Sequence, residues 1–235
     1  MSKKSGYPEL LVFVRHGESE RNRIKRGVFY KDEAERAPLR GVPDHRIGLS
    51  EFGVEQSVKT GIGLANDFGR PDFAFYSGYL RVRETMEHAL AAYSEKQLRK
   101  IERREHPFLV ERNPGYGYDM MKAEADGHFP YIDEFWKTFG HFLSTPIGGE
   151  SLQAVQIRAY LFLDEMLKFY VGEKVFVFAH SGTIRCLASL LEGWSIHDER
   201  WDPKNGSGNC GVTAYGFSKR TGRPKLLVNN RIYWK

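Results

Sequence analysis

The chain has 235 residues, of which 41% are hydrophobic and 28% are charged, a composition typical of an ordinary soluble globular protein. No apolar run approaches the length of a membrane span, and the polar N-terminus has no secretory signal core. We therefore expect a cytoplasmic protein without a membrane partner. Its two cysteines, Cys186 and Cys210, are too few for a disulfide framework or a zinc cluster, and we expect both to be reduced thiols.

The net charge of +5 is mildly basic, and the densest basic runs are residues 21–26 and 99–104. Nucleic-acid binders usually gather Lys and Arg in a stripe, often with interleaved aromatic residues. These runs are short and separate, so we expect no nucleic-acid partner. The second run is expected to be a solvated helix end or loop. The first run could steer an anionic ligand.

The first half of the chain predicts strands alternating with helices. The apolar run Glu9–Val14 predicts a buried strand, followed by a helical turn that begins at Gly17. Residues 31–48 mix proline, glycine and charge, and predict an ordered loop within an extended loop of about residues 23–48. Ser50 is a suitable N-cap for the helix that follows. The next expected elements are strands at 72–76 and 106–110, with a helix at 79–95 between them.

The second half predicts an inserted lobe and the rest of the sheet. Residues 113–148 mix glycine, aromatic and charged residues, with short helices expected near Met120 and over 131–142. The remaining expected elements are helices at 149–170 and 183–191 and strands at 175–179, 211–217 and 226–233, the last antiparallel at an edge. The pattern predicts one α/β domain over residues 1–235, a three-layer sandwich with a mostly parallel central sheet flanked by helices.

Two of the predicted strands end in a histidine that is followed by a glycine-containing helix start. His16 follows the first strand, and His180 follows the strand at 175–179. Ligands of open α/β sheets bind at the carboxyl ends of parallel strands. We therefore expect the two imidazoles to meet at one sheet edge, each at a helix N-terminus, where an anion is favoured.

Short motifs around these histidines follow one another along nearly the whole chain. They are Arg15-His16-Gly17-Glu18-Ser19 with Asn22, Leu49–Gln56, the triplet Ser77, Arg81 and Thr85, Glu111-Arg112, Gly149–Ser151, His180 and Asn209-Cys210. In order and spacing they resemble the signature segments of the histidine phosphatase superfamily, also called the phosphoglycerate mutase-like family.

The resemblance implies phosphoryl transfer through a phosphohistidine intermediate. His16 would be the nucleophile, and a neutral imidazole can attack phosphorus in line. Arg15 and Arg81 would bind the phosphoryl oxygens, because the planar guanidinium donates paired hydrogen bonds and keeps its charge. His180 would donate to a phosphoryl oxygen, and Glu111 would serve as general acid and base.

The resemblance also implies substrate-binding positions at Asn22, Gly17 and Ser181. For Asn22 the alternative is a solvent-facing helix residue. Ser181 stands where the acid phosphatase and phytase branch has aspartate, which disfavours that branch. The sequence carries no metal-binding motif, and the resemblance implies neither a metal nor a nucleotide cofactor.

The sequence favours a phosphatase of small phosphorylated metabolites over a cofactor-dependent phosphoglycerate mutase, which would need 2,3-bisphosphoglycerate. The extended loop is longer than the matching segment of glycolytic mutases and contains no tryptophan. Residues 113–118 also differ from the mutase continuation after Glu111-Arg112. The resemblance places the lobe over the active site. A non-catalytic binding protein on the same fold is a remote alternative, and a homodimer remains one possibility.

Overall fold

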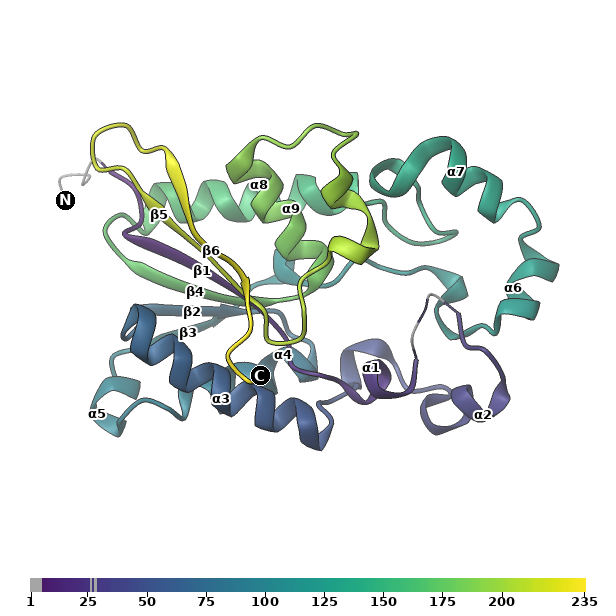
Figure 1. Cartoon of the computed structure of the whole chain (residues 1–235), viewed down its shortest axis with the longest axis horizontal. Helices are drawn as coiled ribbons and strands as arrows, with labels where there is room; N and C mark the ends of the chain where they lie inside the picture. The colour runs from purple at the N-terminus through teal and green to yellow at the C-terminus, as the bar shows by residue number, and fades with distance from the viewer. Residues whose placement is uncertain (1–5, 26, 28) are drawn as a thin grey trace.

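A six-stranded sheet forms the centre of the computed structural model, which describes residues 6–25, 27 and 29–235 (Figure 1). The strand order is β3-β2-β4-β1-β5-β6, with β1 (Leu10–Arg15), β2 (Phe73–Tyr76), β3 (Glu102–Glu105), β4 (Lys174–Ala179), β5 (Val212–Phe217) and β6 (Pro224–Arg231). Strands β3, β2, β4 and β1 pair in parallel, whereas β5 is antiparallel to β1 and to β6. The expected mostly parallel sheet is confirmed.

Both faces of the sheet are buried, and the side chains of its central strands alternate between the two faces. On β1, Leu11 and Phe13 belong to one core cluster, and Val12 and Val14 belong to the other. Helices α8 (Leu152–Phe169) and α9 (Ser181–Glu192) cover the first face, and α3 (Glu51–Phe68) and α4 (Leu80–Leu90) cover the second (Figure 1). The predicted three-layer sandwich is therefore confirmed.

The strand predicted at residues 106–110 was wrong. Residues 106–110 contain a 3-10 turn at Pro107–Leu109, and proline cannot donate to a strand ladder. The edge strand is instead β3, which begins inside the run at residues 99–104 that was expected to be a solvated helix end or loop. All four β3 residues are exposed and charged, so no apolar alternation marked this strand.

Most other elements lie close to their predicted positions. The helix expected at 79–95 ends at Leu90, and a separate short helix follows. The last strand is antiparallel at an edge, as predicted, but β5 is antiparallel as well, which was not predicted. The remaining helices are α1 (Glu20–Ile24), α2 (Glu33–Arg36), α5 (Glu95–Leu98), α6 (Lys122–His128) and α7 (Ile132–Leu143).

The extended loop and the inserted lobe contact each other at one end of the molecule, beside the sheet (Figure 1). Residues 26 and 28 of this loop, and residues 1–5 at the N-terminus, lie outside the described residues. The Tyr30 amide donates to the Met120 carbonyl at 3.0 Å, and the Lys122 amide donates to the Tyr30 carbonyl at 2.9 Å. Arg36 also pairs with Glu124 at 2.9 Å. These contacts join the loop to the first part of the lobe.

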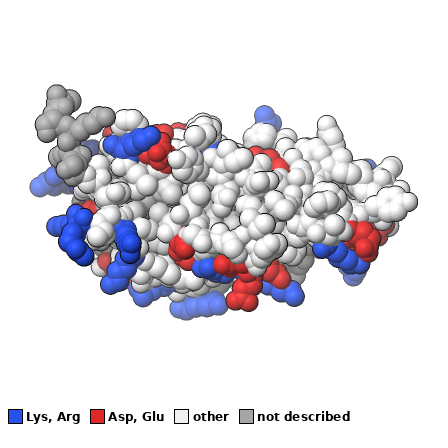
Figure 2. Space-filling model, turned by 90° about the horizontal axis from the view of Figure 1, so that it is seen from above, with Lys and Arg blue, Asp and Glu red and all other residues white. Residues whose placement is uncertain are grey.

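On the face drawn in Figure 2, lysines and arginines lie mostly toward the edges, several of them beside acidic residues. Uncharged surface separates these groups. The expectation of no nucleic-acid partner stays a prediction. Within the described residues, no helix is both long enough and apolar enough to cross a bilayer.

The first turn of α3 packs against the segment that carries His16. A Cβ on Gly53 would collide with the Glu18 carbonyl, and a Cβ on Gly17 would lie 2.5 Å from the Gly53 carbonyl oxygen. Only glycine at both positions allows the two backbones to approach this closely. The position of the loop after β1 therefore depends on these two residues.

We predict that Gly53→Ala lowers the free energy of unfolding by about 1–3 kcal/mol, because the added methyl overpacks this contact. Urea denaturation measures the effect. Gly127→Ala is the matched control, since Gly127 lies in α6 and a methyl group there would meet no atom within 4 Å. It should gain up to ~1 kcal/mol from helix propensity. A Gly53→Ala protein as stable as the control variant would contradict the predicted collision.

Candidate active site

The two histidines lie side by side because they follow paired strands. Strands β1 and β4 are adjacent and parallel, with Arg15 opposite Ala179, and the His16 amide donates to the Ala179 carbonyl at 3.1 Å. The imidazole rings of His16 and His180 have centroids 5.3 Å apart, at an interplanar angle of 64°. The predicted meeting of two histidines at one sheet edge is therefore present in the structure.

His16 presents a defined ring nitrogen. Its Nδ1 lies 2.7 Å from the Gly17 carbonyl oxygen, which can only accept, so Nδ1 carries the proton and Nε2 keeps its lone pair. Burial, followed by the positive charges of Arg81 and Arg15, lowers the pKa of His16 well below 6.5. The ring is therefore neutral at neutral pH, as a nucleophilic imidazole must be.

His180 is fully buried, with its Nε2 2.8 Å from the Ser77 hydroxyl. Its Nδ1 is buried without a hydrogen-bond partner among the described residues and lies 3.9 Å from Glu111 Oε2. Burial, together with nearby positive charge, lowers the pKa of His180 well below 6.5. A buried ring nitrogen without a partner is costly unless a ligand supplies one.

The two arginines expected to bind oxygens approach the histidines from different elements. Arg15 ends β1; one of its Nη atoms donates to the Ser207 carbonyl, and its Nε is buried without a partner among the described residues. Arg81 lies in α4 and is only 6% exposed. Burial lowers the pKa of Arg15, as does the nearby charge of Arg81. The site thus concentrates positive charge beside two neutral imidazoles.

Asp44, which was not among the sequence candidates, occupies the donor face of Arg81. Its two carboxylate oxygens accept from Arg81 Nη1 and Nη2 at 3.0 and 3.2 Å. The Tyr118 hydroxyl also donates to Asp44, at 2.8 Å, and Arg21 lies 3.7 Å away. This carboxylate from the extended loop therefore binds Arg81 in the paired geometry that a phosphoryl group would use.

Glu111 is held by its backbone, while its side chain faces the histidines. Arg158 of α8 donates to the carbonyls of Val110 and Glu111 at 2.8 and 3.1 Å. Glu111 Oε1 accepts from the Arg112 amide at 2.9 Å, and the side chain remains 24% exposed. Glu111 is thus in reach of both His180 and the solvent side of the site.

The three expected substrate-binding residues differ in their surroundings. The Gly17 amide donates to Thr85 Oγ1 at 2.9 Å. Asn22 forms a reciprocal capping box with Ser19, and its Oδ1 also accepts from Asn209 at 3.2 Å. Ser181 begins α9 and lines a cavity. The roles of Gly17, Asn22 and Ser181 in substrate binding stay predictions.

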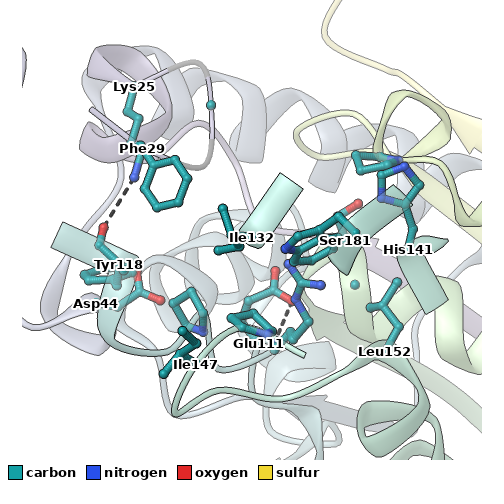
Figure 3. A pocket seen from close by; sticks show the side chains of 18 of the residues that line it. Lys25, Phe29, Asp44, Glu111, Tyr118, Ile132, His141, Ile147, Leu152 and Ser181 are labelled. Atoms are coloured by element: carbon teal, nitrogen blue, oxygen red, sulfur yellow. Dashed lines mark hydrogen bonds between the residues drawn. The ribbon is translucent and has the colours of Figure 1, made fainter. Parts of the chain in front are cut away.

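The cavity has a volume of about 530 Å³ and is lined by Arg81, Glu111 and Ser181 together with residues of the lobe. Figure 3 shows Lys25, Phe29 and Tyr118 on one side of it and His141, Leu152 and Ser181 on the other. The lobe therefore covers the candidate site, as the fold prediction required. Among the described residues, no three His, Cys, Asp or Glu side chains group in a way that could hold a metal ion.

Sequence reasoning missed Asp44 and Arg158, and it considered Arg21 only as part of the basic run at residues 21–26. Asp44 does not follow a predicted strand, and it belongs to a loop of mixed charge. No local pattern therefore marked it as a site residue. Arg158 lies on a helix whose apolar face indicated only core packing. One signal could have identified Arg158. It lies four residues before Phe162, which is fully buried, so it shares the helix face that packs against the sheet.

We predict that the two buried histidines make the protein less stable as the pH falls. Their folded-state pKa values lie below the unfolded value of about 6.5, so the unfolded chain takes up protons first as the pH falls. The stability that the two neutral rings contribute is therefore complete above pH 6.5 and is lost progressively below it. From pH 7 to pH 5, wild type should lose about 2 kcal/mol more unfolding free energy than His180→Asn. Urea denaturation at both pH values measures the difference, with the exposed His197→Asn as control. Equal losses would refute the buried neutral state.

Comparisons of the sequence identify the family. The model of the histidine phosphatase superfamily (branch 1) matches residues 11–230. A 2,3-bisphosphoglycerate-dependent phosphoglycerate mutase of Chelativorans sp. (strain BNC1) is 30% identical over 188 residues, which cover 79% of this chain and 82% of the relative. A phosphoglycerate mutase of Schizosaccharomyces pombe is 29% identical over 189 residues, which cover 79% and 81%.

Solved structures share the fold at lower sequence identity. The alpha-ribazole phosphatase of Shigella flexneri has a TM-score of 0.71 at 20% identity, covering 94% of this chain and 96% of that chain. A mycobacterial glucosyl-3-phosphoglycerate phosphatase in complex with inorganic phosphate has a TM-score of 0.67 at 22% identity, covering 97% and 99%. With the family match over nearly its whole length, this chain belongs to the histidine phosphatase superfamily.

Proposed function

We propose that the protein hydrolyses small phosphomonoesters through a phosphohistidine on His16. The observation that carries the proposal is the state of this residue: a neutral ring whose Nδ1 is bonded to the Gly17 carbonyl, which leaves Nε2 free to attack. Beside it lie Arg15 and Arg81 and a second imidazole, the groups needed to stabilise three phosphoryl oxygens. All of these groups are present together, which argues against a non-catalytic binding protein.

The proposed reaction has two balanced steps. In the first, His16 Nε2 attacks phosphorus and the bond from phosphorus to the ester oxygen breaks, while Glu111 gives its proton to the departing alkoxide. In the second, water attacks phosphorus while Glu111 takes a proton from that water, and the bond from phosphorus to His16 Nε2 breaks, which releases inorganic phosphate and restores the neutral imidazole. His180 contributes a donor: if the Ser77 hydroxyl donates to Nε2, Nδ1 carries the proton that faces the phosphoryl oxygen.

Arg81 must exchange one anion for another during this cycle. In the structure it donates to both oxygens of Asp44. A phosphoryl group offers oxygens at similar spacing and more charge, so it can replace the carboxylate. Asp44 therefore keeps a buried guanidinium paired between turnovers, which avoids the cost of an isolated buried charge.

Hydrolysis is favoured over mutase chemistry by the surroundings of the site. A mutase must shield its phosphohistidine from water, whereas Glu111 keeps 24% of its side chain exposed beside an open cavity. Phosphoglycerate mutases are among the relatives, at 27–31% identity, so mutase activity is the alternative to hydrolysis. Only in that case would 2,3-bisphosphoglycerate be a cofactor.

We predict that His16→Ala abolishes phosphate release, by at least a factor of ~10⁴, because the nucleophile is lost. Wild type, incubated with ³²P-labelled acetyl phosphate and quenched in alkali, should carry acid-labile label that His16→Ala lacks. The assay contains EDTA, since the proposed steps use only side chains. Release that survives in His16→Ala would refute the phosphohistidine mechanism.

The mutase alternative is tested in the same preparation. Isomerisation of 3-phosphoglycerate is followed with and without 2,3-bisphosphoglycerate, beside phosphate release from the same substrate. Isomerisation that depends on the bisphosphate, with little release, would replace the proposed hydrolysis by mutase activity.

We also predict that Asp44→Asn binds inorganic phosphate about tenfold more tightly than wild type, because the competing charge on Arg81 is removed while the side chain keeps its shape. Titration calorimetry with phosphate measures this without turnover. Asp133→Asn is the matched control, since Asp133 lines the same cavity but lies 3.8 Å from the exposed Lys122. Weaker binding in Asp44→Asn would mean that Asp44 orients Arg81 for phosphate instead of competing with it.

A further inference from the structure

The cavity beside Glu111 is larger than a phosphoryl group with a short polar alcohol requires. It measures about 530 Å³, and Arg81, Glu111 and Ser181 form part of its wall, so it opens directly onto the candidate catalytic groups. Cavities of roughly 300–1,000 Å³ enclose whole organic ligands. The space beyond the reacting phosphate therefore has room for a substantial organic group.

The part of the wall that the lobe contributes is mainly apolar. Ile132 and Trp136 lie one turn apart on the same face of α7, and both line the cavity while remaining only partly buried. Phe129 lines it as well. Ile147 and Leu152 of α8 also contribute to the wall (Figure 3). Apolar surface thus stays uncovered inside the cavity, where a ligand could bury it.

The Trp136 ring is backed by a charged group of the same site. The Arg112 guanidinium lies over this ring, 5.5 Å from its centroid. A cation over an indole face restrains the ring by a cation–π attraction. Trp136 is therefore a positioned part of the wall, connected through Arg112 to the neighbouring Glu111.

The chemistry of this wall discriminates between alcohols. An apolar group that displaces water from it gains about fourfold in binding for each buried methylene. A hydroxyl buried against Ile132 or Trp136 loses its hydrogen bond to water without replacement, which costs about tenfold or more. Glycerate and sugar hydroxyls are disfavoured for that reason where they meet only these apolar side chains, whereas Asp133 and His141 line other parts of the cavity.

Resting on the proposed function, we infer that the substrate is a phosphomonoester whose alcohol carries a bulky apolar group, an aromatic ring or an alkyl chain, which binds between α7 and Leu152. The phosphoryl group binds at His16 and the two arginines. The apolar group then holds the ester oxygen beside Glu111 and limits how far water enters the cavity.

A series of primary alkyl phosphates tests the inference, because the leaving alcohols have similar acidity and differ in apolar size. From ethyl to hexyl phosphate, kcat/KM should rise about 250-fold, which is about fourfold for each of the added methylenes on burial. Propyl phosphate should exceed glycerol 3-phosphate, which has the same carbon chain and two added hydroxyls. Phosphate release is measured for wild type and for His16→Ala.

Substitutions in the cavity wall test whether the selectivity for longer alkyl chains depends on this cavity. Trp136→Ala should lower the hexyl-to-ethyl ratio of kcat/KM about tenfold, and Ile132→Ala should lower it in the same direction. Tyr131→Ala is the control, because Tyr131 is 81% exposed at the start of the same helix and does not line the cavity. Its ratio should equal that of wild type, and circular dichroism checks the folding of each variant.

The outcomes separate this inference from the proposed function. Release that needs His16 but does not vary with chain length, or a ratio unchanged in Trp136→Ala and Ile132→Ala, overturns the apolar substrate and leaves the phosphatase intact. If no phosphate ester is hydrolysed, the proposed function fails. Calorimetry with hexyl- and ethylphosphonate then decides the cavity separately: tighter binding of the hexyl compound supports an apolar ligand, and equal binding overturns it.

Discussion

The parallel pairing of β1 with β4 is the constraint on which the site depends. Its register sets Leu11 opposite Val175 and Arg15 opposite Ala179, so the residues that follow both strands lie together. A slip by one residue would turn each apolar side chain to the opposite face, where a different core is packed. Because both faces are buried, the register is strongly specified. The geometry of the candidate site is thus a consequence of core packing on two sides of one sheet.

Buried positive charge is the second feature that organises the site. Arg15 and Arg81 lie beside His16 and His180 in surroundings with little water, which lowers the pKa of both imidazoles. Such a concentration of charge is costly without an anion. Asp44 supplies one for Arg81, which makes the extended loop part of the electrostatics of the site.

The proposed chemistry and the inferred selectivity involve different parts of the molecule. The histidines and Arg15 lie at or directly after β1 and β4, whose side chains belong to the two cores. Much of the cavity wall comes from α7 and the segments around it, outside the sheet, although Leu152 of the wall also belongs to the first core cluster. This division allows a family with one reaction to act on many substrates, since loops vary on a fixed scaffold.

Much of the fold and part of the candidate site could be predicted from the sequence, because apolar runs, glycines and helix caps determine structure within a few residues. The strands before His16 and His180 and the Ser50 cap of α3 follow from patterns within a few residues. Strand β3 does not, because an exposed edge strand needs only backbone pairing, which charged residues can make. Asp44 does not either, since its partners Arg81 and Tyr118 are 37 and 74 residues away in the chain. The sequence by itself determined the fold class and the candidate site residues that follow the strands; the tertiary structure alone decided the loop carboxylate on Arg81 and the apolar cavity, because both arise from contacts between distant segments.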